Sequence, residues 1–241
     1  MPINWPDSPT IRQQYTSPNG DVWCWNGYAW DNLSLQSSGK YQGEWVIFDP
    51  VWSPRYYLSI FSALAGAVSG DTIYLCTNTS EGYSFGSSGI YLKDNVNINL
   101  NGNTLNYTFG DGTQTDGFRA YGFNSSFKSK FQNGTVTFTG NHDGINRVGF
   151  RIAGEFAEMD FTGLTVNFTG LSAITSSDSS IDGGSFNNLS TNPTSYGAYF
   201  RVGFFDWQSG GFDTNRSYLR NIKGSSIGGN GVLISASSLY E

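Results

Sequence analysis

The sequence predicts an all-β protein in which most of the chain forms a solenoid of short stacked strands. Charged residues make up 13% of the 241 residues and glycine contributes 31 of them, whereas an ordinary soluble domain is about 25% charged. Asn, Ser and Thr fill most of the other polar positions. A surface of amides and hydroxyls with many turns is typical of extended β-structure and argues against a helical bundle.

Two kinds of pattern predict the solenoid. Residues 95–101 read Asn-Val-Asn-Ile-Asn-Leu-Asn, an alternation that puts aliphatic side chains on one face of a strand and amides on the other. Strand-like phrases also recur at a spacing of about 30 residues. The recurring phrases are 134–140 with 164–170, and Gly117-Phe118-Arg119-Ala120 with Gly149-Phe150-Arg151-Ile152 and the echo Tyr199-Phe200-Arg201-Val202. A β-sandwich is the rival architecture, but it does not predict phrases at a fixed period.

Three segments precede or begin this array. Residues 1–35 are predicted to be a three-strand meander with tight turns at Asn19-Gly20 and Asn26-Gly27, and residues 36–55 a linker. A helix is expected at 56–68, because Tyr57, Phe61, Leu64 and Val68 fall at helical spacing. It begins a solenoid domain over 56–241 and is expected to cover the bare edge of the first coil.

Residues 56–103 resemble the N-terminal cap and first coils of the pectate-lyase-like superfamily. The resemblance is carried by the segments 59–67 and 70–75, by Tyr83, and by 90–103, which ends in Asn101-Gly102-Asn103. It implies a right-handed parallel β-helix. Members of the superfamily include polysaccharide lyases, hydrolases, surface proteins and phage tailspikes, so the fold alone does not specify a function.

The N-terminal meander is similar to a short Trp-rich segment common in phage tail and fibre proteins. The segment is Pro18-Asn19-Gly20 followed by Trp23-Cys24-Trp25-Asn26-Gly27 and Trp30. Together the two resemblances imply a bacteriophage tail-fibre or tailspike component that attaches to the host surface. They imply a homotrimer that is located in the virion, after synthesis in the host cytoplasm, and that joins other tail proteins through residues 1–35. The alternatives are a polysaccharide-degrading tailspike and a capsid decoration protein.

An enzyme of this fold would need a pair of carboxylates across a sugar. The candidate catalytic residues are Asp143, Glu155, Glu158 and Asp160, with Asp178, Asp182 and Asp206 as further acids. No nucleophile motif accompanies them, and His142 is the only histidine. We therefore expect a non-catalytic protein without a metal or cofactor.

Basic and aromatic residues provide the candidate binding sites. Arg119, Arg151 and Arg201 hold equivalent places in their phrases and are predicted to form an outward ladder, for an acidic glycan or a neighbouring subunit. Exposed aromatic side chains are expected to form the virion-attachment or subunit interface. These residues are Trp23, Trp25, Trp30, Phe204, Phe205 and Trp207.

Charge and hydropathy exclude other classes. The formal net charge is −6 and no basic stripe is present, which argues against nucleic-acid binding. The N-terminus does not read as a signal peptide, and no apolar run is long enough to cross a bilayer. Cys24 and Cys76, the only cysteines, are expected to be reduced.

Overall fold

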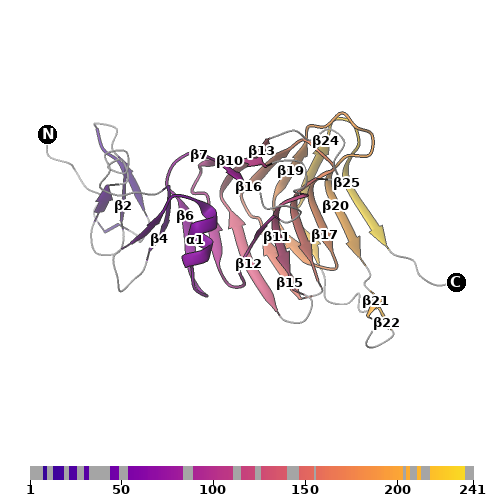
Figure 1. Cartoon of the computed structure of the whole chain (residues 1–241), viewed down its shortest axis with the longest axis horizontal. Coiled ribbons are helices and arrows are strands. Elements are labelled where there is room, and N and C mark those ends of the chain that lie inside the picture. The colour runs from indigo at the N-terminus through magenta and orange to yellow at the C-terminus, as the bar shows by residue number, and fades with distance from the viewer. Residues whose placement is uncertain are drawn as a thin grey trace.

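The computed structural model contains three stacked sheets of mainly parallel strands, preceded by a small antiparallel sheet (Figure 1). It describes residues 8–9, 13–18, 22–25, 30–32, 44–48, 54–83, 89–110, 115–122, 126–139, 147–154, 156–202, 205–206, 211–212 and 218–236. The expected all-β class is confirmed.

The small sheet is formed by the Trp-rich segment. Its strands are β1 (Gln14–Thr16), β2 (Val22–Trp25) and β3 (Trp30–Asn32), and they pair antiparallel in that order. The rings of Trp25 and Trp30 lie 5.6 Å apart on paired strands. The three expected strands are therefore present, and tryptophans from neighbouring strands cover one another.

The three stacked sheets are called here sheets I, II and III. Sheet I consists of β7 (Thr79–Tyr83), β10 (Thr104–Phe109), β13 (Gly134–Thr139), β16 (Leu164–Phe168), β19 (Ser185–Asn188) and β24 (Lys223–Ser226). Sheet II consists of β8 (Ile90–Tyr91), β11 (Asp116–Tyr121), β14 (Val148–Ala153), β17 (Ser172–Ser177), β20 (Tyr196–Val202) and β25 (Asn230–Ala236). Sheet III consists of β5 (Arg55–Tyr57), β4 (Trp45–Ile47), β6 (Thr72–Leu75), β9 (Asn97–Asn99), β12 (Phe127–Gln132), β15 (Ala157–Asp160), β18 (Ser180–Asp182) and β23 (Leu219–Arg220). A separate two-stranded ribbon joins β21 (Phe205–Asp206) to β22 (Gly211–Phe212).

From β6 to β20 the chain visits sheets III, I and II in turn and then returns to sheet III beside its previous strand there. This order makes every pair of neighbouring strands from β6 onward parallel, except in the short ribbon. Such a succession explains why similar phrases recur along the sequence, because each pass must again supply three strands with apolar inward residues.

The registers bring repeated residues side by side in a continuous core. Leu105 pairs with Val136, and Val136 with Val166, while Phe118 stacks on Phe150 at 5.1 Å between ring centroids. All five side chains are almost completely buried. The repeated phrases are thus neighbouring rungs of one aromatic and aliphatic interior.

One glycine of the repeated phrase is required by a close approach. A Cβ at Gly117 would overlap the ring of Phe138 and lie 2.7 Å from the carbonyl oxygen of Gly149. Gly149, its neighbour on the next strand, approaches the same ring. The Phe138 side chain can therefore fill the interior only because these two positions have no side chain.

The helix is shorter than the expected range 56–68. It is α1, Ile60–Gly66, with Ser59 as N-cap in a capping box with Ser62. The prediction was wrong at its start because residues 55–57 pair with β4 as strand β5. Its apolar stripe was also wrong, since Phe61 is 50% exposed and Val68, beyond the helix, is 63% exposed. The buried face of α1 consists of Ile60, Ala63 and Leu64, whose small central alanine allows the helix close to the core.

The range 36–55, expected to be a linker, contains a buried strand. Trp45, Val46 and Ile47 form β4, which lies antiparallel between β5 and β6 in sheet III. The edge of the first parallel strand, β6, is therefore covered by β4, and α1 packs against β4 and β5 (Figure 1).

Candidate functional site

Outward side chains of sheet III form two columns of charged and polar residues. On β12 and β15 the inward positions are Phe127, Ser129, Phe131, Ala157 and Met159, all buried. The alternation of a β-strand then directs the intervening residues to the outer face.

Parallel register aligns these outward residues from one strand to the next. The first column contains Lys128, Glu158 and Ser180, followed by Tyr218 just before β23. The second column contains Lys130, Asp160, Asp182 and Arg220. Residues of four strands that lie far apart in the sequence thus form one surface, which is about three strand spacings long, roughly 14 Å.

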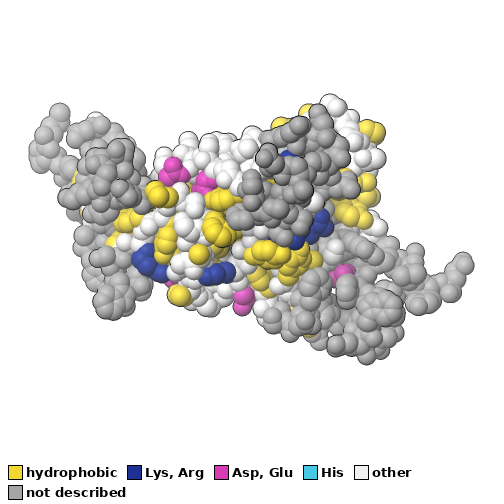
Figure 2. Space-filling view, in the orientation of Figure 1, with side chains coloured by type: hydrophobic (Ala, Val, Ile, Leu, Met, Phe, Trp, Pro, Cys, Tyr) yellow, Lys and Arg dark blue, Asp and Glu magenta, His cyan; other side chains and the backbone are white. Residues whose placement is uncertain are grey.

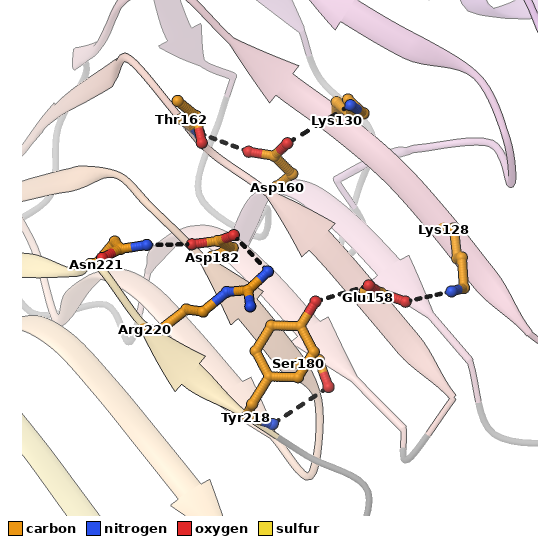
Figure 3. Close-up of polar contacts among 10 residues, drawn as sticks. All are labelled: Lys128, Lys130, Glu158, Asp160, Thr162, Ser180, Asp182, Tyr218, Arg220 and Asn221. Carbon is orange, nitrogen blue, oxygen red and sulfur yellow. Dashed lines mark hydrogen bonds and ion pairs between the residues drawn. The ribbon is translucent and has the colours of Figure 1, made fainter.

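Every carboxylate in the two columns lies beside a cation (Figure 3). Lys128 Nζ lies 2.6 Å from Glu158 Oε2, and Lys130 Nζ lies 3.7 Å from Asp160 Oδ2. Asp182 Oδ2 lies 2.8 Å from an Nη atom of Arg220. The cationic side chains are 53–66% exposed and the carboxylates 19–36%, so the positive groups are the outermost of the site.

Tyr218 fixes the end of the first column. Its hydroxyl donates a hydrogen bond of 2.6 Å to Glu158 Oε1, and its backbone N–H donates to the Ser180 hydroxyl at 3.2 Å. The Arg220 guanidinium lies over its ring at 4.6 Å from the ring centroid. Together these contacts hold both residues of the last rung in place.

The columns border a shallow groove with a volume of about 350 Å³. Its lining residues are Asn95, Asn97, Lys128, Ser129, Lys130, Glu158, Asp160, Asp182, Tyr218 and Arg220. Three basic and three acidic side chains balance in charge within it. A surface of closely spaced donors and acceptors is suited to a ligand rich in hydroxyl groups. We call this site the sheet III groove.

Two carboxylates of the groove, Glu158 and Asp160, are held in their ionised form. The Lys128 ion pair and the Tyr218 hydrogen bond lower the pKa of Glu158. Burial alone would raise the pKa of Asp160, but hydrogen bonds from Thr162 and Gln132 and the charge of Lys130 outweigh it, and the pKa is lowered. A glycosidase acid needs a raised pKa so that it keeps its proton near neutral pH. Neither carboxylate meets that condition.

Of the four candidate catalytic residues, the groove contains Glu158 and Asp160. Asp143 and Glu155 lie outside the described residues, as does His142. Of the further acids, Asp182 lies in the groove, Asp178 is buried in a turn with a positive φ of 58°, and the Asp206 side chain is outside the described part.

Sequence reasoning missed Lys128, Lys130, Tyr218 and Arg220. The alternating run Phe127-Lys128-Ser129-Lys130-Phe131 did contain a signal, since it directs both lysines outward. No repeated phrase, however, linked Arg220 to Asp182.

The predicted arginine ladder is only partly present. Arg119 pairs with Arg151 in register, but the column continues with Thr175 and Tyr199. Arg201 was wrongly included, because it pairs with Ser177 instead. The phrase Tyr-Phe-Arg is shifted by two residues relative to the earlier Gly-Phe-Arg phrases, and Ala198 rather than Phe200 continues the Phe118 and Phe150 column.

The remaining arginines share a buried carboxylate on the outer side of sheet II. The Nε atoms of both Arg119 and Arg151 donate to Oδ2 of Asp116, the latter at 2.9 Å. Asp116 is completely buried. The two guanidinium groups are therefore brought together by one acid.

The proposed aromatic interface is described only in part. Trp23, Trp25 and Trp30 are half-buried in the small sheet. Phe204 and Trp207 lie outside the described residues, and Phe205 belongs to β21 but its side chain is outside them too. The interface stays a prediction. On the described surface in Figure 2, uncharged side chains predominate and charged ones form small separate groups.

Within the described part of the chain, no group of three His, Cys, Asp or Glu residues has the proximity that a metal ion requires. No helix there is long and apolar enough to span a bilayer. Comparisons with protein-family models, with curated proteins and with solved structures found no match.

Proposed function

We propose that this chain is a bacteriophage virion protein, a component of a tail fibre or tailspike, that contacts a host-surface polysaccharide without cleaving it. In this proposal the three stacked sheets are a right-handed parallel β-helix, and the Trp-rich sheet attaches the protein to other tail proteins. The resemblances of residues 56–103 and 18–30 support the assignment to a virion.

The observation that supports binding without cleavage is the ion pairing of the carboxylates in the sheet III groove. Each of its three carboxylates has a cation within 4 Å, and the pKa values of Glu158 and Asp160 are lowered. Ionised carboxylates and ammonium groups form hydrogen bonds with sugar hydroxyls, but neither acid is held protonated to donate to a leaving group.

Binding and cleavage can be measured on the same sample. We expect the full-length protein to bind one polysaccharide from a panel of bacterial capsules, O-antigens and wall polymers in surface plasmon resonance. Prolonged incubation should release no new reducing ends and no unsaturated uronic acids. Arg220→Gln should weaken binding, since Arg220 is exposed at the groove. A protein that binds none of the panel would contradict the proposal.

One observation favours a depolymerase as the second candidate. Asp160 and Asp182 are direct neighbours in register, which puts their backbones about 4.8 Å apart. Retaining glycosidases hold their carboxyl groups at about 5–5.5 Å. Cleavage that is abolished by Asp160→Asn, with binding retained, would establish this candidate instead.

The proposed virion role includes a homotrimer. Light scattering should give a mass near three times 26.4 kDa, independent of protein concentration. A monomeric mass would contradict the trimer and would favour a decoration protein or a single-chain enzyme.

A further inference from the structure

A second polar site lies on the outer side of sheet II, and its charges do not balance. Asp116 is the one carboxylate described in ion-pair contact with Arg119 or Arg151. Among the described residues, two guanidinium groups surround one carboxylate, which is an excess of one positive charge in a chain whose formal net charge is −6. A local positive excess on an acidic protein attracts anions selectively to that place.

Arg151 directs donors to solvent at this site. Its Nε atom is used by Asp116 at 2.9 Å, while its side chain remains 38% exposed. Among the described residues, Asp116 Oδ2 is the only acceptor of a hydrogen bond from Arg151. The two terminal nitrogens of Arg151 can therefore donate to a ligand. Arginine can hold a planar or tetrahedral anion with two parallel N–H donors.

Two tyrosines stand beside the arginines. Tyr91 precedes Arg119 in the same column and is 53% exposed, and the Arg119 guanidinium lies 5.9 Å from the centre of its ring. The ring of Tyr121 lies 5.9 Å from that of Tyr91. Burial raises the pKa of Tyr121, which is close enough to respond to the charges of Arg119, Asp116 and Arg151. Exposed rings combine an apolar face with a polar hydroxyl, and both can contact a sugar.

We propose that Arg119, Arg151, Tyr91 and Tyr121, supported by Asp116, form a subsite for an anionic sugar unit. The anion binds the terminal nitrogens of Arg151, and the sugar ring lies on the exposed face of Tyr91. A free inorganic anion would use the arginines but not the aromatic ring. This inference rests on the proposed function, because it specifies which sugars the attachment protein recognises.

Calorimetric titration of the full-length protein tests the subsite with three probes of equal length. They are an oligogalacturonate, a sulfated galactose oligomer and a neutral galactose oligomer. At least one anionic probe should bind, and at least tenfold more tightly than the neutral probe, because hydrogen bonds between ionised groups are stronger than those between neutral groups. The anionic probe that binds more tightly identifies the anion as a carboxylate or a sulfate.

Variants locate the binding. Arg151→Gln should weaken the anionic probe at least tenfold and reduce the salt dependence of its affinity, and Tyr91→Ala should weaken it as well. Lys223→Gln is the matched control, since it removes an exposed cation of sheet I that belongs neither to the sheet III groove nor to this subsite. Thermal unfolding of each variant confirms that it is folded.

Several results would overturn the subsite. They are equal affinities for the neutral and anionic probes, an unchanged affinity in both Arg151→Gln and Tyr91→Ala, or a loss in Lys223→Gln as large as that in Arg151→Gln. Failure of both anionic probes to bind would also overturn it. If a host polysaccharide still binds through the sheet III groove in these cases, the proposed function survives while the subsite does not.

Discussion

The Tyr218 hydroxyl donates a hydrogen bond of 2.6 Å to Oε1 of Glu158, although 60 residues separate the two in sequence. The other carboxylate oxygen of Glu158 is paired with Lys128. A single glutamate thus connects β12 with the segment that leads into β23, and both of its oxygens are occupied. This arrangement makes the groove a preorganised array of charges, which reduces the entropy lost when a ligand binds.

Removal of this carboxylate should be visible in the titration of its partner. Burial and the Glu158 carboxylate raise the pKa of Tyr218 to about 12. In Glu158→Gln the negative charge is absent, so we expect the pKa of Tyr218 to fall toward the ordinary value of about 10. Carbon-13 labelling of tyrosine and NMR at rising pH measure it. Lys130→Gln, whose side chain pairs with Asp160 instead, should leave Tyr218 much less affected, and equal shifts in the two variants would contradict the assignment.

A methyl group at Gly117 should destabilise the protein. Gly117→Ala forces the Phe138 ring out of its place or shifts the backbone of β14, and overpacking of this kind typically costs about 1–3 kcal/mol. Gly82→Ala is the matched control, because its Cβ would lie 3.8 Å from Thr108, an ordinary contact. Denaturant unfolding compares the two. Similar free energies of unfolding for both variants would show that the interior is not tightly packed at Phe138.

The sequence was sufficient to predict strands wherever local alternation and packing agree. Val96, Ile98 and Leu100 were expected inside and are buried. The repeated phrases predicted neighbours correctly where the spacing was constant, as for Phe118 and Phe150. At these positions the local alternation and the contacts between neighbouring strands require the same residue types. The sequence pattern therefore predicts both the strand and its neighbour.

The groove could not be predicted because it depends on register between strands without similar sequences. Glu158 and Lys128 belong to different phrases, and only the pairing of β12 with β15 brings them together. The Arg201 error has the same origin, since a shift of two residues keeps the inward and outward alternation and leaves no trace in the pattern. The helical stripe failed because Tyr57 is also compatible with a strand, and pairing with β4 favours β5 over an added helical turn.

Glu81 should make the protein less stable as the pH rises. It lies under the start of α1, where it accepts hydrogen bonds from Trp45 Nε1, the Ile60 N–H and the Tyr83 hydroxyl. Burial raises the pKa of Glu81 above its ordinary value, and these hydrogen bonds oppose the rise only in part. A raised folded-state pKa means that the stabilising contribution is present at low pH and is lost as the pH rises through that value.

The neutral variant Glu81→Gln tests this sign. The free energy of unfolding of Glu81→Gln relative to wild type should be higher at pH 7 than at pH 4, because only the wild type acquires a buried charge in between. Chemical unfolding at several pH values measures the difference. A relative stability that falls over this range would show that the three hydrogen bonds outweigh burial.

Asp160→Asn should show the opposite dependence. The pKa of Asp160 is lowered in the folded protein, so its contribution is present above the ordinary value of about 4 and is lost as the pH falls through the folded-state value. We therefore expect the variant to be less stable than wild type at pH 7 by at most about 1 kcal/mol, since the ion pair with Lys130 is half-exposed. The deficit should shrink on acidification below pH 4. The asparagine carbonyl can still accept the hydrogen bond that Thr162 N–H donates to Asp160 at 2.9 Å, so the turn is preserved and the measurement isolates the charge. A deficit that is independent of pH would mean that Asp160 acts through shape alone, and the ion-paired groove would lose part of its basis.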